Sequence, residues 1–172
     1  RGNTNACVQT VAVNDTTTPT ITWYRTNVLV AAGTNCQATM PAITGTNYIL
    51  VGDNCSSVTV TQSVATNAVL NLGTNEVVLG AFDAAGNVAY CTIYVVVLVE
   101  LVVEAFPARH GLSQPYGYGT NLVPAGEVIT NQVSPTETGP GVQYVCTGWT
   151  GTGDVPPSGS TNAVVFTATT NS

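Results

Sequence analysis

The sequence predicts an all-β protein of two tandem β-domains with an extra strand at the N-terminus. Three observations lead to this prediction. Short runs rich in Val, Ile, Thr and Tyr alternate with clusters of Gly, Pro, Asn and Asp, as strands alternate with turns. No stretch shows the 3.6-residue period of an amphipathic helix. One strand pattern also occurs twice, which indicates repeated modules.

The chain is organised around a predicted hairpin over residues 76–106. Its two arms are rich in β-branched and aromatic residues, and the turn between them contains Gly86-Asn87. The second arm continues past Glu100 without a flexible Gly/Ser linker. We therefore predict that it is both the last strand of one domain and the first strand of the next, with a stiff joint.

The start of the chain repeats the second arm of this hairpin at a fixed offset of 84 positions. The identical pairs are Gly2 and Gly86, Asn3 and Asn87, Cys7 and Cys91, Val11 and Val95, and Val13 and Val97. We therefore expect residues 1–14 to be the terminal strand of a preceding or neighbouring module. Its candidates for strand exchange are Cys7, Val8, Gln9, Thr10, Val11, Ala12 and Val13.

Charge and composition exclude several classes of function. The net charge is −6, with three arginines and no lysine, so nucleic acids and anionic membrane surfaces are not expected partners. Only 7% of residues are charged, as suits a secreted β-protein whose solubility rests on neutral polar groups. The apolar run 93–106 is shorter than the roughly 20 residues of a membrane span. We predict an extracellular or cell-surface location and no membrane insertion.

The chain ends and the cysteines fit secretion. The first residue is Arg1 and no signal segment precedes it, so we expect a processed chain or a fragment. Five cysteines without Cys-x-x-Cys spacing favour a disulfide-permissive compartment over a metal site. They are Cys7, Cys36, Cys55, Cys91 and Cys146.

The titratable residues predict no catalytic, cofactor or metal site, and the chain is not expected to be an enzyme. His110 follows Arg109 in a turn and is expected to be a surface residue. Asp15 and Asp53 lie at turns and could reach a calcium ion at a module junction, as hard oxygen ligands do. No dense ligand loop surrounds them, so turn capping is the favoured interpretation, and Asp83 is likewise interpreted as a turn former.

Residues 15–100 carry four motifs in order. They are Asp15-Thr-Thr-Thr-Pro-Thr-Ile-Thr, Asn35-Cys36-Gln37, Asp53-Asn54-Cys55 and Asp83-Ala-Ala-Gly-Asn-Val-Ala-Tyr-Cys91. In these motifs the segment resembles the hyalin repeat, a secreted module. The resemblance implies an immunoglobulin-like β-sandwich, and it makes residues 1–14 look like the tail of another copy.

The same resemblance implies a pairing of cysteines. Cys36 and Cys55 match the inner pair of the family, which implies a disulfide that closes a loop of about 20 residues and contributes roughly 3 kcal/mol. Trp23 stands where the family has a cysteine, so Cys91 lacks its expected partner. Cys7 would pair upstream, and a bridge between Cys7 and Cys91 would require different chains or registers.

Residues 101–172 carry a second set of motifs. They are Ser113-Gln-Pro-Tyr-Gly, Pro124-Ala-Gly-Glu-Val, Tyr144-Val-Cys-Thr-Gly-Trp-Thr-Gly and Val164-Val-Phe. This segment resembles a divergent bacterial form of the internalin B-repeat, a small β-domain of secreted surface proteins. Compared with members of that family, the segment is expected to lack the last strand.

These features favour a structural role. We expect a subunit or segment of an extracellular fibre or adhesin that assembles head to tail with copies of itself, by addition of strand 1–14 to a neighbouring module. In a variant of this hypothesis, peptide bonds join the modules. The alternative is a non-catalytic carbohydrate- or ligand-binding module of a larger secreted enzyme. That alternative predicts an exposed row formed by Tyr24, Tyr48, Tyr116 and Tyr118.

Overall fold

The computed structural model describes residues 2, 4–106 and 109–170, and these form fourteen strands and no helix. The predicted all-β class is therefore confirmed. Within the described ranges, no helix has the length and apolarity that crossing a membrane requires. Six residues of the predicted strand and domains lie outside the described residues: Arg1, Asn3, Pro107, Ala108, Asn171 and Ser172.

The first half of the molecule is sandwich-like. Its strands are β1 (Thr20–Tyr24), β2 (Asn27–Ala31), β3 (Ile49–Gly52), β4 (Thr59–Gln62), β5 (Gly73–Phe82) and β6 (Val88–Val103). One sheet consists of β1 and β3, and the other has the order β2-β6-β5-β4. The chain crosses from the first sheet to the second between β1 and β2, where Tyr94 N donates a 2.8 Å hydrogen bond to Thr26 O.

Strand β6 extends through both halves of the molecule. Its first ten residues pair antiparallel with β5, and residues 94–98 pair in parallel with β2. Residues 98–103 then pair antiparallel with β8 (Gly119–Pro124). The strand predicted to continue past Glu100 is therefore present and ends at Val103. The domain boundary placed at residue 100 stays a prediction, because one strand belongs to the sheets of both halves.

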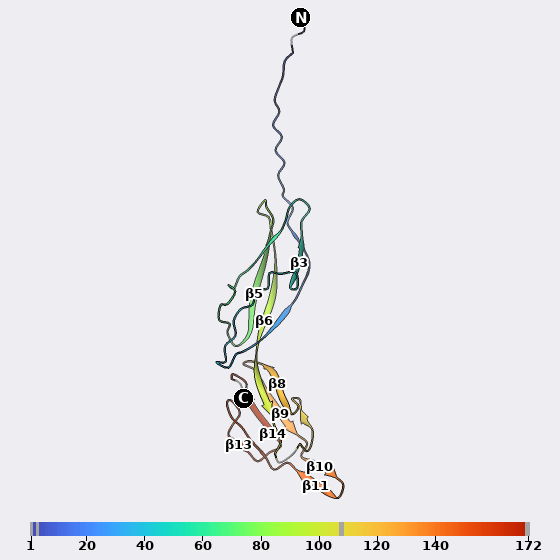
Figure 1. Ribbon diagram of the computed structural model, residues 1–172, viewed down its shortest axis with the longest axis vertical. Coiled ribbons are helices and arrows are strands. Elements are labelled where there is room, and N and C mark those ends of the chain that lie inside the picture. Colours follow the sequence, from blue (N-terminus) through green and yellow to red (C-terminus); the bar gives the residue numbers. More distant parts are fainter. Residues whose placement is uncertain (1, 3, 107–108, 171–172) are drawn as a thin grey trace.

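Alternation along β6 builds a continuous core. Its odd-numbered residues from 93 to 101 are all buried: Ile93, Val95, Val97, Val99 and Leu101. In the first half they belong to one cluster with Met40 and Ile43, and in the second half the same cluster includes Val123 and Phe166. Each such fully buried side chain contributes about 1.5–3 kcal/mol through removal of apolar surface from water. The two halves therefore share one hydrophobic core, which is built along β6. Strand β6 itself runs along the long axis of the molecule (Figure 1).

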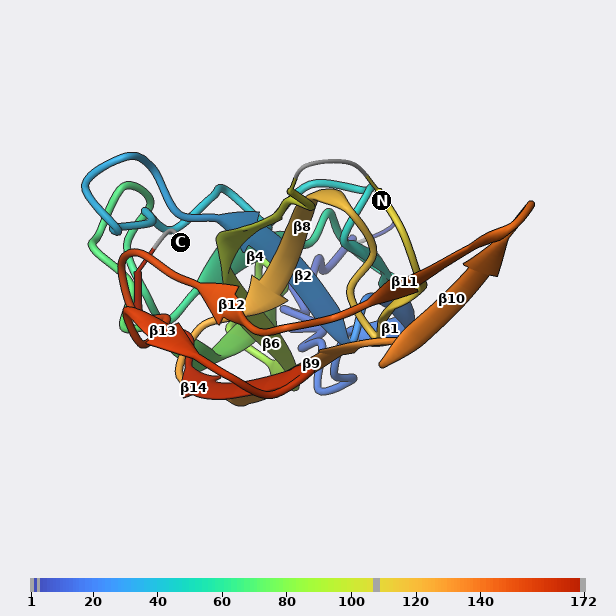
Figure 2. The ribbon, with the colours of Figure 1, turned by 90° about the horizontal axis from the view of Figure 1, so that it is seen from below.

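The second half contains the shorter strands. They are β7 (Ser113–Gln114), β8, β9 (Val128–Val133), β10 (Thr136–Gly139), β11 (Val142–Val145), β12 (Trp149–Thr150), β13 (Ser158–Gly159) and β14 (Ala163–Thr167). A three-stranded sheet has the order β14-β9-β7, and β12 pairs with β13. The hairpin of β10 and β11 projects from the side of the body (Figure 2).

Backbone hydrogen bonds hold the joint between the halves. Ala125 N donates to Val97 O at 2.9 Å, and Ala32 N, directly after β2, donates to Leu98 O at 2.7 Å. Gly73 has a φ of 83°, and a Cβ added to it would lie 3.1 Å from Ala125 O. Glycine is favoured there because other residues rarely adopt this backbone conformation and their Cβ would crowd the Ala125 carbonyl oxygen.

Asp154 anchors the end of the described chain and makes stability depend on pH. Its carboxylate accepts hydrogen bonds from the backbone amides of Thr169 and Thr170 and a 2.8 Å bond from Thr169 Oγ1. Burial alone would raise the pKa of Asp154, but these hydrogen bonds outweigh burial and hold the pKa below its ordinary value. The folded protein therefore favours the charged form more than the unfolded chain does.

We expect Asp154→Asn to lower the free energy of unfolding by about 1–2 kcal/mol at neutral pH. A depressed folded-state pKa contributes stability above the unfolded pKa of about 3.9, and this stability is lost as pH falls through the folded pKa. The difference between wild type and variant should thus shrink below about pH 4. Urea unfolding of both proteins over a series of pH values measures this difference in the free energy of unfolding. A difference that stays constant with pH would contradict the lowered pKa of Asp154.

Candidate functional site at the N-terminal end

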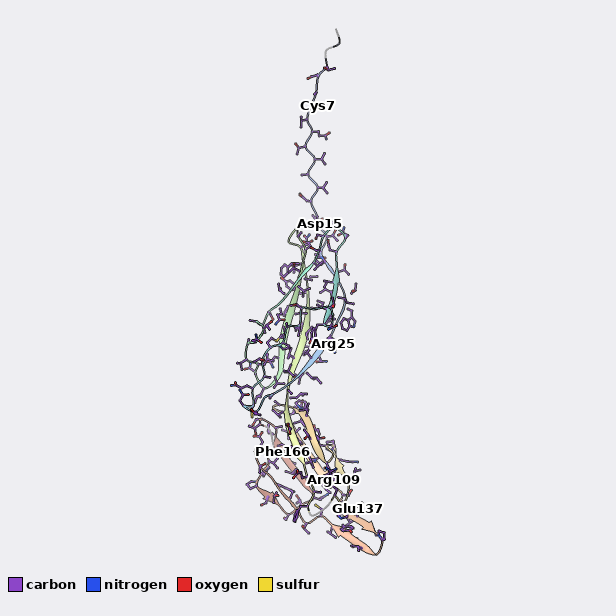
Figure 3. All side chains as sticks on the ribbon, viewed as in Figure 1. Cys7, Asp15, Arg25, Arg109, Glu137 and Phe166 are labelled. Atoms are coloured by element: carbon purple, nitrogen blue, oxygen red, sulfur yellow. The ribbon has the colours of Figure 1, made fainter. Side chains whose placement is uncertain are left out.

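The N-terminal segment 4–14 is an extended peptide that joins none of the described sheets. It projects from the end of the first half, with Cys7 far out on the segment and Asp15 at its root (Figures 1 and 3). Its valines are exposed to solvent: Val8 by 95%, Val11 by 73% and Val13 by 91%. Exposed apolar surface can mark a protein interaction site, and three exposed valines within residues 8–13 make this segment a candidate.

The repeat offset relates this segment to positions of known burial in β6. Val11 and Val13 correspond to Val95 and Val97, which are fully buried, whereas Thr10 corresponds to Tyr94, which is 43% exposed. In a strand, successive side chains point to opposite faces. If the segment paired as β6 does, its odd-numbered residues would face a core and its even-numbered residues would face solvent.

Gln9 is the polar exception on the face that would be buried, since the offset of 84 matches its position to that of Ile93 in β6. The first half already accommodates one inward-facing glutamine, Gln62 of β4. Its side chain accepts a 2.9 Å hydrogen bond from Ile43 N and donates one of 2.7 Å to Val64 O. A glutamine on the core face of such a strand is therefore compatible with this kind of fold when backbone groups satisfy its amide.

Three aspartates meet at the end of the first half from which the segment projects. Asp15 precedes β1, Asp53 follows β3, and Asp83 begins the turn between β5 and β6. One carboxylate oxygen of each lies within 4.8 Å of one carboxylate oxygen of the other two. Asn87 links two of them, because its Nδ2 donates to Asp83 Oδ2 at 2.8 Å and to the Asp15 carbonyl oxygen at 3.3 Å.

The predicted turn-capping role of these aspartates is confirmed. Asp15 Oδ1 accepts from Thr17 N at 3.0 Å, Asp53 Oδ2 accepts from Cys55 N at 2.9 Å, and Asp83 Oδ1 accepts from Asn87 N at 2.8 Å. Burial would raise the pKa of Asp83, but hydrogen bonds from the Asn87 side chain and from backbone amides of the turn outweigh it and hold the pKa below its ordinary value. Asp83 therefore carries a negative charge at neutral pH.

From the sequence, a shared ion was considered for Asp15 and Asp53 and set aside in favour of turn capping, and Asp83 was not placed with them. The available signal was topological: each aspartate caps a turn, and the antiparallel pairing of β1 with β3 and of β5 with β6 brings turns to the same end of the sandwich. The sequence alone does not give those pairings, because the three positions are 30 or more residues apart. Only the folded arrangement shows that the capping residues share one site.

The structure does not bring Cys36 and Cys55 together, so the bridge implied by the resemblance is not formed. Cys36 lies in the turn that follows β2, whose last residue pairs with Leu98 of β6. Cys55 lies at the opposite end, where the adjacent Ser56 Oγ accepts from Ala84 N. About ten residues of β6, or roughly 33 Å, separate these ends. A disulfide requires Cα atoms within about 7 Å of each other.

All five cysteines are free thiols in this structure. Cys91 lies half-buried in β6, and burial raises the pKa of its thiol. Cys7 lies on the projecting segment, away from the body that contains Cys91 (Figure 3). A bridge between Cys7 and Cys91 therefore stays a prediction for pairs of chains.

The tyrosines of the alternative hypothesis do not form one row. Tyr24 and Tyr48 lie in the first half, in β1 and just before β3. Tyr116 and Tyr118 lie between β7 and β8 in the second half and are half-buried. The hydroxyl of Tyr118 also donates a 2.9 Å hydrogen bond to His110 O.

His110 anchors the projecting hairpin of β10 and β11, a role that the sequence did not predict. Its ring stacks on Tyr144 with centroids 3.5 Å apart, and its Nδ1 lies 3.3 Å from Glu137 Oε2. Gly111 N donates to the same Glu137 oxygen at 2.6 Å. These contacts give the residue a structural role in the second half.

Comparison with known proteins found no matching family model, no matching curated protein and no matching solved structure. The likeness to the hyalin repeat and to the internalin B-repeat therefore stays a prediction from the sequence motifs.

Proposed function

We propose that this chain is a structural segment of an extracellular fibre or adhesin, assembled head to tail with copies of itself. In this proposal the segment 1–13 adds as a strand to the sheet of a neighbouring module. The observation that carries it is the extended, unpaired state of residues 4–13 together with their exposed valines. Strand addition satisfies backbone groups through main-chain hydrogen bonds and takes specificity from alternate side chains.

The architecture supports a linear assembly. The segment projects from one end of an elongated molecule, and the second half lies at the other end (Figure 1). In that second half, the outer strands of the sheet β14-β9-β7 pair with no further described strand, so an added strand could pair with one of them. A contact between unlike ends of identical chains is heterologous, and its repetition gives an open filament.

The joint between the halves also suits a load-bearing segment. β6 crosses the joint without interruption, and the core continues along it. A continuous strand with a continuous core resists bending more than a Gly/Ser linker does. Such a stiff unit transmits tension along a fibre through backbone hydrogen bonds.

The test is deletion of residues 1–13. We expect the intact chain to form larger species as its concentration rises, and the truncated chain to stay monomeric in sedimentation velocity. Thermal unfolding of the two should be alike, because residues 4–13 pair with no sheet of their own chain. Assembly that survives denaturant without reductant would instead indicate modules joined by covalent bonds. An intact chain that remains monomeric when concentrated would refute the proposal.

A further inference from the structure

The three aspartates at the root of the projecting segment converge on one point. Asp15 lies at the root of the segment, whereas Asp53 and Asp83 lie in turns of the body, and one carboxylate oxygen of each comes within 4.8 Å of the other two. Like charges this close repel each other unless a cation lies between them. Capping of turns explains only one oxygen of Asp15 and one of Asp53, because each cap uses a single carboxylate oxygen.

The remaining oxygens of two aspartates are buried and have no partner. Asp15 Oδ2 and Asp53 Oδ1 are inaccessible to water, and neither accepts a hydrogen bond. Buried charged oxygens of this kind are normally hydrogen-bonded, paired with a cation or bound to a metal. This observation is independent of the clustering, since neighbouring carboxylates on a protein surface ordinarily direct their free oxygens to solvent.

No positively charged side chain in the described residues compensates this site. The chain has no lysine. Arg25 Nε donates to Asn47 O, and Arg109 lies over the ring of Tyr118 in the second half. A cation for this site must therefore come from outside the described chain.

We propose that Asp15, Asp53 and Asp83 bind a calcium ion at the root of the N-terminal segment. Calcium takes six to eight oxygen ligands at about 2.3–2.6 Å, so oxygens on opposite sides of one ion lie up to about 5.2 Å apart. The three carboxylates meet this limit. Magnesium binds at about 2.1 Å, demands a near-ideal octahedron and usually keeps several waters, which suits a solvent-poor site less well.

Calcium at this site would tie the segment to the body. The carbonyl oxygen of Asp15 already accepts a hydrogen bond from Asn87 of the body, and the ion would add ligands from the turns that follow β3 and β5. The segment would then leave the body in a fixed direction. That this fixed direction orients the segment for addition to a neighbouring chain rests on the proposed function, whereas calcium binding itself does not.

Isothermal titration of the full chain with calcium chloride, after removal of metals by a chelator, tests the site. We expect a single ion per chain, with affinity at least about tenfold weaker in Asp15→Asn and Asp53→Asn. Glu127→Gln is the matched control, since this exposed carboxylate lies in the second half, and it should leave affinity unchanged. Absence of binding to the folded wild type, or equal affinity in Asp15→Asn, would overturn the proposal. Equal affinity for magnesium would overturn the choice of calcium.

Hydrogen exchange gives a second readout that does not depend on assembly. Calcium should slow amide exchange around residues 15–17 and 53–56 in wild type and leave the Asp15→Asn variant unaffected. Asp15 precedes the first strand, so its replacement by the isosteric amide should preserve the fold, as circular dichroism would check. A chain that binds calcium and stays monomeric refutes only the fibre proposal. A chain that assembles without binding calcium refutes only the site.

Discussion

Val97→Asp is expected to prevent stable folding of both halves of the molecule. The side chain of Val97 is fully buried, and the residue pairs with Gly73 of β5 on one side of β6 and with Val30 of β2 on the other. An unpaired carboxylate at this position would be buried without a partner, at a cost above about 4 kcal/mol. A typical domain has only about 5–15 kcal/mol of stability.

The effect should reach the second half because the two halves share this part of β6. The carbonyl oxygen of Val97 accepts the hydrogen bond from Ala125 N, directly after β8. Residues on either side of the joint belong to one hydrophobic cluster. Loss of packing at Val97 therefore removes support from β8 as well as from β2 and β5.

Each half contains one tryptophan, Trp23 in β1 and Trp149 in β12, so tryptophan fluorescence can follow the unfolding of each half separately. In urea unfolding of single-tryptophan variants, we expect the two transitions to coincide in the wild type and to be absent or strongly shifted in Val97→Asp. Val102→Asp is the matched control, because Val102 lies on the same strand but is 42% exposed. Its cost should stay within about 1 kcal/mol. Cooperative unfolding of Val97→Asp at wild-type urea concentrations would contradict the shared core.

The hairpin of β5 and β6 was predictable because its signals are local. β-branched residues favour a strand, and the turn Asp83–Asn87 supplies a capping carboxylate and a glycine, Gly86, with a φ of 92°. The continuation past Glu100 was predictable for the same reason, since no turn residue interrupts the alternation.

Contacts between distant segments were not predictable from these signals. The parallel pairing of β2 with β6 joins residues nearly 70 positions apart, and neither strand carries a residue that specifies it. The segments around Thr39 and Val69 meet in only an isolated antiparallel bridge. Strand pairing depends on packing against the rest of the sandwich more than on intrinsic propensity.

The location of the candidate site was likewise not predictable from local signals in the sequence. Asp15, Asp53 and Asp83 were each correctly interpreted as turn formers, but their common location depends on topology. The pairing of Cys36 with Cys55 was implied by the resemblance to the hyalin repeat, and the motifs that carry this resemblance do not show which end of the sandwich each turn occupies. The structure places them at opposite ends of β6.

Val11→Asp is expected to abolish assembly without changing the stability of the isolated chain. The repeat offset matches Val11 to Val95, a fully buried residue of β6, so strand addition would bury the new carboxylate. A cost of about 3 kcal/mol or more corresponds to a loss in affinity of at least about 100-fold. In the free chain Val11 is 73% exposed, so its replacement should leave thermal unfolding unchanged. Sedimentation velocity over a concentration series measures the assembly.

Thr10→Asp tests whether the segment docks as a strand or merely adheres. Thr10 corresponds to Tyr94, which is 43% exposed in β6, so a charge there would remain in solvent after docking. Assembly should then survive Thr10→Asp almost unchanged, since adjacent residues of a strand point to opposite faces. Equal losses from the two substitutions would indicate nonspecific association through an apolar tail. A difference between neighbours requires a fixed register, because only a paired strand distinguishes residue 10 from residue 11.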